Sequence, residues 1–231
     1  MQTDGVMGRS QPRSNAWVRG GTPATLNLAG LRLPLLETAV VVVASFVLLV
    51  EWYHTLLPFD DHLLARGLER ALLYGLVPLA ALLLLRQHPG DYGLRLGEWR
   101  VGLLAAAAAA AVATPVILVA SSWPDVHAYY RQESVEPVRF ALANVLDVGA
   151  AEFLFRGFLM MALVRWCGPL GVVLATFPFV FVHLGKPELE ALSTVITGIG
   201  FGWLAWRTRS ILYGALLHVY ILTLVMVAAS L

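Results

Sequence analysis

The sequence predicts an all-α protein, a polytopic membrane helix bundle of about seven or eight transmembrane helices, and three observations lead to this prediction. Hydrophobic residues make up 58% of the chain and charged residues only 13%, which is about half the charged fraction of an average soluble domain. The mean hydropathy is +0.73. Several apolar stretches are long enough, or nearly so, to cross a bilayer core about 30 Å thick as a helix.

Seven such stretches follow one another without a soluble domain, a repeat or a long linker between them. We expect the spans at residues 34–57, 69–86, 101–123, 138–165, 169–185, 188–206 and 211–230. These stretches are too long and too uniformly apolar to be barrel strands, and an open sheet would leave backbone groups unsatisfied in lipid. Residues 34–231 are therefore expected to form one transmembrane helix bundle.

The first 33 residues differ in composition, because they combine Gly, Ser, Pro and Asn with four arginines. We expect residues 1–33 to form a disordered basic tail. The apolar stretch that follows is too long for the core of a secretory signal, and Pro34 suits the first position of a helix. Arg and Lys are more numerous in the loops on the side of the N-terminus, which predicts a cytoplasmic N-terminus. We expect an integral protein of the cell (inner) membrane.

Four ionisable residues lie inside the predicted spans, namely Glu152, Arg156, His183 and His218. A charge at the centre of a bilayer costs about 2.5–3.5 kcal/mol, and such residues usually face the bundle interior and mark a functional site. Glu152 and Arg156 are four residues apart, so they share a helix face and can pair. A purely structural ion pair and two satisfied core histidines are the alternative interpretation.

A carboxylate, its arginine and two imidazoles are the groups needed to activate a water and stabilise an oxyanion. Metal binding is a competing interpretation, in which Glu152, His183 and His218 would ligate an ion from three helices. The His-Glu-x-x-His spacing of zinc peptidases is absent, so we expect neither a metal nor another cofactor. The net charge of +1 does not predict nucleic-acid binding, which requires a concentrated basic face. Membrane lipid is the expected partner.

Three motifs resemble those of the CPBP intramembrane proteases, the family of the type II CAAX prenyl endopeptidases and of bacteriocin-processing and self-immunity (Abi-like) proteins. The segment from Ala151 to Leu159 is similar to the first motif, E-E-x-x-x-R followed by Gly. Phe179 to His183 matches the second motif, F-x-x-x-H, and His218 begins a segment that approaches the third, H-x-x-x-N or H-x-x-x-D. The resemblance covers about residues 138–225, which would form the protease core.

This resemblance implies a metal-independent, glutamic-type endopeptidase that cleaves a membrane-associated peptide or protein. It assigns catalytic roles to Glu152, Arg156, His183 and His218, and it places Phe179 in the substrate pocket. Two positions depart from the family pattern. The first Glu, which activates water in the family, is Ala151 here, and the third-motif Asn or Asp, which holds the oxyanion, is Leu222.

The two departures leave three accounts open. In the first, Glu152 is itself the base, with both histidines orienting the water and the oxyanion. In the second, another acid substitutes: Asp147, about a turn and a half before Glu152, or Glu190, which could fold back over the site. In the third, the chain keeps the scaffold without the chemistry, as a catalytically inactive membrane binding or self-immunity protein.

Overall fold

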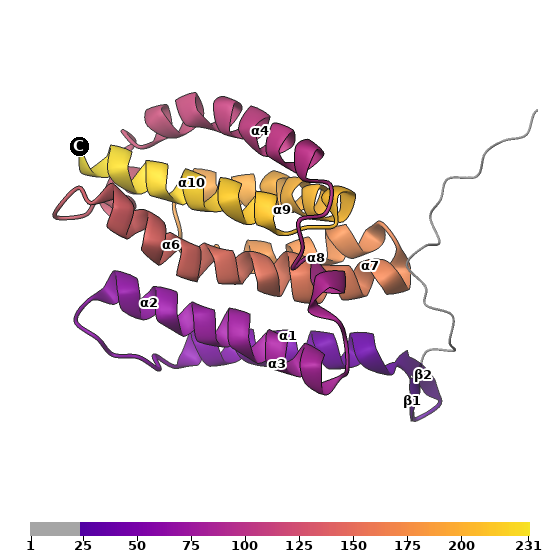
Figure 1. Cartoon of the computed structure of the whole chain (residues 1–231). Helices are drawn as coiled ribbons and strands as arrows, with labels where there is room; N and C mark the ends of the chain where they lie inside the picture. Colours follow the sequence, from indigo (N-terminus) through magenta and orange to yellow (C-terminus); the bar gives the residue numbers. More distant parts are fainter. Residues whose placement is uncertain (1–23) are drawn as a thin grey trace, which may run out of the picture.

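The computed structural model describes residues 24–231, which fold almost entirely into helices that run side by side (Figure 1). The helical elements are α1 (Leu35–Tyr53), α2 (His62–Arg70), η1 (Ala71–Leu76), α3 (Val77–Leu84), η2 (Pro89–Tyr92), α4 (Trp99–Ala120), α5 (Pro124–Tyr130), α6 (Pro137–Glu152), η3 (Phe153–Met160), α7 (Met161–Cys167), α8 (Leu170–Phe181), α9 (Glu188–Thr208) and α10 (Leu212–Ser230). The all-α prediction is confirmed.

Two π-helical segments, η1 and η3, continue directly into their neighbouring α-helices, so residues 62–84 and 137–167 are each one long helix. With that joining, the helices occupy the seven predicted stretches, and the short helix α5 is additional. Within residues 24–231, five helices are long and apolar enough to cross a membrane: Leu35–Tyr53, His62–Leu84, Trp99–Ala120, Glu188–Thr208 and Leu212–Ser230. Of the other two predicted spans, α8 is a shorter apolar helix, and residues 137–167 carry Asp147, Glu152 and Arg156 near their middle.

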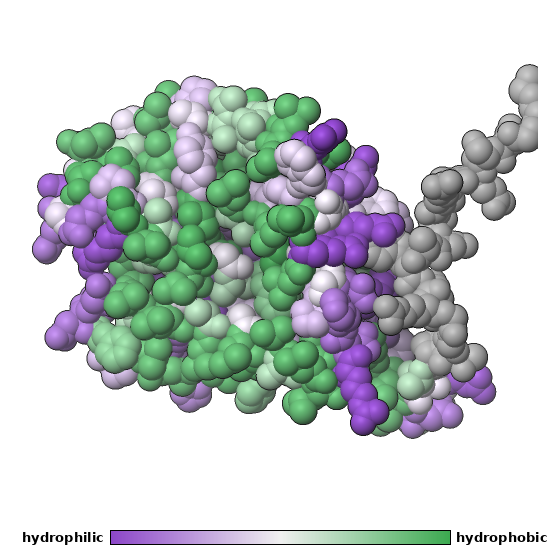
Figure 2. All heavy atoms as spheres, viewed as in Figure 1, coloured by the Kyte–Doolittle hydropathy of each residue, from purple (hydrophilic) through white to green (hydrophobic). Residues whose placement is uncertain are grey.

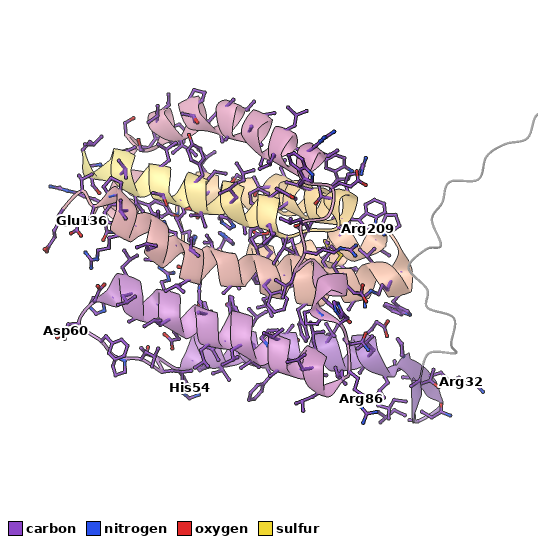
Figure 3. The ribbon with its side chains drawn as sticks, in the orientation of Figure 1. Arg32, His54, Asp60, Arg86, Glu136 and Arg209 are labelled. Carbon is purple, nitrogen blue, oxygen red and sulfur yellow. The ribbon has the colours of Figure 1, made fainter. Side chains whose placement is uncertain are left out.

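The outer surface of the bundle agrees with a lipid environment. A broad apolar band crosses the space-filling view between two polar ends (Figure 2). Large apolar side chains are exposed on several helices, including Phe46 of α1, Val112 of α4 and Ile196 of α9, which is 77% exposed. Labelled charged residues lie towards the ends, with Arg32 at one and Glu136 at the other (Figure 3). The chain is therefore an integral membrane protein.

The helix formed by α6, η3 and α7 is the centre of the bundle. It packs against α2 on one side and α10 on the other, α8 lies along η3 and α7, and α4 covers α10 (Figure 1). All eight residues of η3 are buried, and its Phe155 and Phe158 belong to the main hydrophobic core. Segments of π-helix are rare and occur often at functional sites, and this one begins immediately after Glu152.

The N-terminal end of the described chain is a small hairpin rather than the disordered chain that was expected up to residue 33. Strands β1 (Thr25–Leu28) and β2 (Leu31–Pro34) pair antiparallel, with Leu26 opposite Leu33. The turn between them is Ala29-Gly30, both with positive φ, which is the backbone shape of the favoured two-residue hairpin loop. Residues 1–23 of the expected tail lie outside the described residues.

Gly97 fixes the approach of the loop before α4 to the end of α9. Its φ is +53°, and a Cβ built there would lie 2.0 Å from the carbonyl oxygen of Thr208. We expect Gly97→Ala to lower the free energy of unfolding by at least about 2 kcal/mol, because the left-handed backbone and the backbone contact both resist a side chain. The measurement is unfolding in mixed micelles followed by circular dichroism.

Gly149 is the matched control, because it lies inside α6 with nothing within 4 Å of a built Cβ. Gly149→Ala should raise the free energy of unfolding by about 0.5–1 kcal/mol through helix propensity. Equal effects of the two substitutions would contradict the assignment of Gly97 as a contact that the fold requires.

Candidate active site

Glu152 and Arg156 form an ion pair in the centre of the bundle, as their spacing predicts. Glu152 is the last residue of α6, and Arg156 follows it in η3. Arg156 Nη1 lies 3.3 Å from Glu152 Oε1, and the side chains are 3% and 1% exposed. A carboxylate in so apolar a place stays charged only when a cation or hydrogen bonds compensate for lost hydration. Arg156 supplies that charge.

His218 of α10 is the second partner of Glu152. Its Nδ1 lies 2.8 Å from Glu152 Oε1. Because an ionised carboxylate can only accept hydrogen bonds, Nδ1–H donates to Glu152, and neutral His218 carries its lone pair on Nε2. A carboxylate that fixes the tautomer of an imidazole in this way is the arrangement that prepares histidine to act as a general base.

His183 lies in the turn that follows α8, and its ring is fixed by the backbone. Nδ1 is 2.7 Å from the carbonyl oxygen of Phe179, so Nδ1–H must donate and Nε2 again carries the lone pair. The turn closes with Lys186 N–H donating to His183 O, and Gly185 adopts a φ of +88°. Glycine reaches this left-handed conformation without the penalty that a side chain would bring. Both histidines therefore hold a proton acceptor at Nε2.

Two phenylalanines surround the charged pair and the imidazoles. The Arg156 guanidinium lies 3.7 Å from the ring centroid of Phe179 in α8 and 5.5 Å from that of Phe201 in α9. Phe179 also packs against His183, and Phe201 against His218, with centroids 4.6 and 5.4 Å apart. A guanidinium over an aromatic face is attracted by the ring quadrupole. The rings thus hold Arg156 in place while excluding water.

Three atoms of the pair have no hydrogen-bond partner among residues 24–231, namely Glu152 Oε2 and both Nη atoms of Arg156. The 3.3 Å contact between Arg156 and Glu152 is an ion pair without hydrogen-bond alignment. Buried polar atoms are nearly always hydrogen-bonded in folded proteins, and exceptions mark functional sites or sites for water. These atoms have the donors and the acceptor to bind a small polar group.

The histidine cavity, as we name it, has a volume of about 250 Å³ and is lined by His183, His218 and Phe179. Its remaining wall is mostly apolar, from α4, α9 and α10. Glu152 does not line it and is 1% exposed, so it lies behind His218. The groups that a molecule in this cavity would meet are the imidazoles, not the carboxylate.

The structure separates the two candidate substitute acids. Asp147 Oδ1 accepts from Arg70 Nη1 at 2.6 Å, and Arg66 Nε lies 3.7 Å from Asp147 Oδ2. Asp147 therefore points towards α2 and lines a different cavity. Glu190, in contrast, lines the histidine cavity.

Glu190 is held by two neighbours in the wall of the histidine cavity. It accepts a hydrogen bond from Tyr130 OH, and its other oxygen lies 2.8 Å from Lys186 Nζ. Burial, and then the charge of Glu190, raise the pKa of Tyr130, so this hydroxyl stays protonated and donates. Glu190 is the acid that the fold places with the two histidines.

Residues 133–224 match the family model described as type II CAAX prenyl endopeptidase Rce1-like. This part of the chain is Rce1-like. The match confirms the resemblance drawn from the three motifs, and the Rce1-like segment contains Glu152, Arg156, His183 and His218. No curated protein and no solved structure matches the chain.

The two departures from the motifs lie in apolar surroundings within the Rce1-like segment. Ala151 is 5% exposed and belongs to the main hydrophobic core. Leu222 lines the histidine cavity and packs beside a second core cluster that includes Phe140 and Met226. Neither position offers a polar side chain. The polar side chains of this cavity are the two histidines, the wall formed by Tyr130, Lys186 and Glu190, and three hydroxyl residues of α9, Ser193, Thr194 and Thr197.

Metal binding would require a cluster of ligands. Over residues 24–231, no three His, Cys, Asp or Glu side chains lie together as metal ligands would.

Sequence reasoning missed Tyr130, Lys186 and Phe201 as site residues. The four-residue spacing of Lys186 and Glu190 was a usable signal for their ion pair. Tyr130 and Phe201 carry no local signal, because long-range packing brings them to the site.

Proposed function

We propose that the protein is an intramembrane endopeptidase of the CAAX-protease type, with His218 as the general base and Glu152 as the carboxylate that orients it. One observation carries the proposal. Glu152 receives Nδ1–H of His218 at 2.8 Å inside the bundle, while the same imidazole lines the cavity. That geometry turns Nε2 into a proton acceptor facing a space where a peptide bond and a water could meet.

The proposed reaction begins when His218 Nε2 takes a proton from a water whose oxygen attacks the scissile carbonyl carbon. His183 Nε2 accepts a hydrogen bond from the second hydrogen of that water and so aims its lone pair. Glu152, kept ionised by Arg156, stabilises the imidazolium that forms. The carbonyl π electrons move to oxygen. When the C–N bond breaks, the proton on His218 passes to the leaving amine.

The oxyanion needs a donor, and neither histidine supplies one in this scheme, because His183 commits its N–H to the Phe179 carbonyl. Lys186 is the cation of the cavity wall. We assign it to oxyanion stabilisation, which works best in a site of low dielectric constant. Lys186 would then compensate for Leu222, which stands at the family's oxyanion position and lines the same cavity. All groups in the scheme belong to the chain, so it proceeds without a metal.

The proposed substrate is a membrane-associated peptide or protein. Apolar lining from α4, α9 and α10 favours aliphatic or aromatic groups beside the scissile bond, and burial of apolar area is the main driving force in such a pocket. Prenylated peptides fit the same lining, and the matched family is named for them. We further propose that the protein lies in the cell (inner) membrane with its N-terminus on the cytoplasmic side.

The alternative is a catalytically inactive membrane binding or self-immunity protein built on the same scaffold. The observation in its favour is that Ala151 and Leu222 stand in apolar packing where the family has polar groups. Such a protein would bind a peptide in the histidine cavity without cutting it.

A cleavage assay in proteoliposomes separates the two functions. It presents fluorogenic peptides, prenylated and unprenylated, to the purified protein with and without a chelator. The proposal expects chelator-resistant cleavage. Tight binding of these peptides without turnover, in protein that retains its helical content, would favour the inactive scaffold.

Glu190 and Asp147 should respond in opposite ways to loss of charge. Glu190→Gln should lower kcat by about tenfold to 100-fold, because it removes the charge that holds Lys186 in the cavity wall. Asp147→Asn should leave kcat per folded molecule near wild type but lower the free energy of unfolding by about 2 kcal/mol, because it weakens the bond to Arg70. A kcat loss confined to Asp147→Asn would show that Asp147, and not Glu190, is the acid that supports catalysis.

A further inference from the structure

A second cavity, which we name the polar chamber, lies next to the histidine cavity. It has a volume of about 90 Å³, and its wall contains Arg70, Gln132, Asn144, Asp147, Lys186 and Tyr130. A water occupies about 30 Å³ in the liquid, and a buried water needs two to four polar partners. The chamber therefore has room and hydrogen-bonding groups for about three waters.

The polar chamber and the histidine cavity share part of their walls. Tyr130, Lys186 and Leu222 line both spaces, so a single layer of side chains separates them. Glu190, which lines only the histidine cavity, binds two of the three through the Tyr130 hydroxyl and Lys186 Nζ. Two of the three side chains of the partition are thus held in position by Glu190.

The other side of the polar chamber leads towards the surface. Arg66 and Tyr129 line it, and Arg66 has a side chain 50% exposed while Tyr129 is 41% exposed. Both lie at the end of the bundle where α2 begins and α5 ends. The polar chamber is therefore bordered by partly exposed polar groups at that end of the bundle and by the partition.

We propose that the polar chamber binds water and supplies it to the histidine cavity through the partition of Tyr130, Lys186 and Leu222. A hydrolase surrounded by lipid needs such a supply, because the outer faces of its helices are apolar and give water no favourable path to the site. Use of the water rests on the proposed function, but its presence in the chamber does not.

The test compares three buried methionines by radiolytic hydroxyl-radical labelling of the full-length protein in detergent, because thioether oxidation reports nearby water. Met226 lines the polar chamber, whereas Met160 and Met161 belong to the main core and line neither cavity. Their exposed fractions are similar, at 4%, 1% and 2%. Met226 should be oxidised roughly tenfold faster than the other two, and Leu222 in the partition should also be labelled.

Asn144→Leu tests the chamber itself, because Asn144 donates to Thr223 Oγ1 and contacts Met226 at its wall. This variant should reduce labelling of Met226 to the rate of Met160, and labelling of Leu222 should fall with it. Val148→Phe, which fills most of the chamber without removing a polar group, should do the same. In active protein both variants should lower kcat and leave KM unchanged.

The outcomes separate the inference from the proposed function. If Met226 is labelled no faster than Met160 and Met161, the polar chamber does not bind water and the inference is wrong, whether or not the protein cleaves peptides. Fast labelling of Met226 and Leu222 that both filling variants abolish supports it, even in a protein that cleaves nothing. If Met226 is labelled while Leu222 is not, water in the chamber does not reach the partition and the supply route is wrong.

Discussion

Glu152→Gln is expected to lower kcat by about 10³-fold to 10⁴-fold while KM changes little. The carboxylate lies behind His218, 1% exposed, and touches the imidazole at Nδ1. A neutral amide can donate to Nδ1 as well as accept from it, and donation selects the tautomer whose Nε2 carries a proton. That tautomer cannot accept a proton from water. Glutamine also loses the negative charge that stabilises the imidazolium.

The measurement is the steady-state cleavage of one fluorogenic peptide by wild type, Glu152→Gln and Glu188→Gln in proteoliposomes. Glu188 is the matched control, because it is an exposed acid in the first turn of α9 and faces no part of the proposed mechanism. It should keep wild-type kcat. His218→Gln should resemble Glu152→Gln, and the double variant should be no worse than either, because the two residues act as one unit. Cleavage by Glu152→Gln at more than about a tenth of the wild-type rate would contradict a Glu–His dyad.

The helices were predictable because apolar length is a local property. A stretch of about 20 apolar residues has few alternatives to a membrane helix, and seven such stretches became the long helices of the bundle. The short helix α5 was missed although its sequence carries start signals. Pro124 occupies its first turn and Asp125 follows, a pattern that favours a helix N-terminus.

The site was predictable only as far as helix periodicity extends. Glu152 and Arg156 pair across one turn, as spacing requires. The partner of Asp147 is Arg70, 77 residues earlier in the chain, and no local pattern indicates it. About a turn and a half separates Asp147 from Glu152, which places the two acids on different faces of the helix. Asp147 therefore contributes to the contact with α2, whereas Glu152 contributes to the candidate active site.

The direction of each imidazole could not be read from the sequence either. Which nitrogen of His218 faces Glu152 depends on the rotation of α10 against α6, which packing between the helices determines. His183, in the turn after α8, owes its fixed ring to a carbonyl four residues earlier, at Phe179 near the end of that helix. The motifs therefore identify the residues, and the three-dimensional packing decides that histidines rather than Glu152 face the cavity.

Arg156→Met is expected to lower the free energy of unfolding by about 3–5 kcal/mol, because it leaves Glu152 buried with its main counter-charge removed. Packing contributes little to this loss, since methionine is long, unbranched and makes favourable contacts with aromatic rings such as Phe179. The double variant Glu152→Gln/Arg156→Met should recover most of the loss, because it buries no charge. The measurement is the free energy of unfolding in mixed micelles, followed by circular dichroism. Values for wild type, Glu152→Gln, Arg156→Met and the double variant complete a double-mutant cycle.

Arg139 supplies the comparison for this cycle, because it forms an ion pair with Asp61 at 2.8 Å on the surface. Exposed pairs are hydrated in both states, so Arg139→Met should change the unfolding transition by less than the error of the measurement. Additive losses at Glu152 and Arg156 would show that the two residues do not interact in the bundle. Strong coupling at this pair, with no measurable change on Arg139→Met, would establish that Arg156 maintains the charge on Glu152, which is the condition for His218 to work as a base.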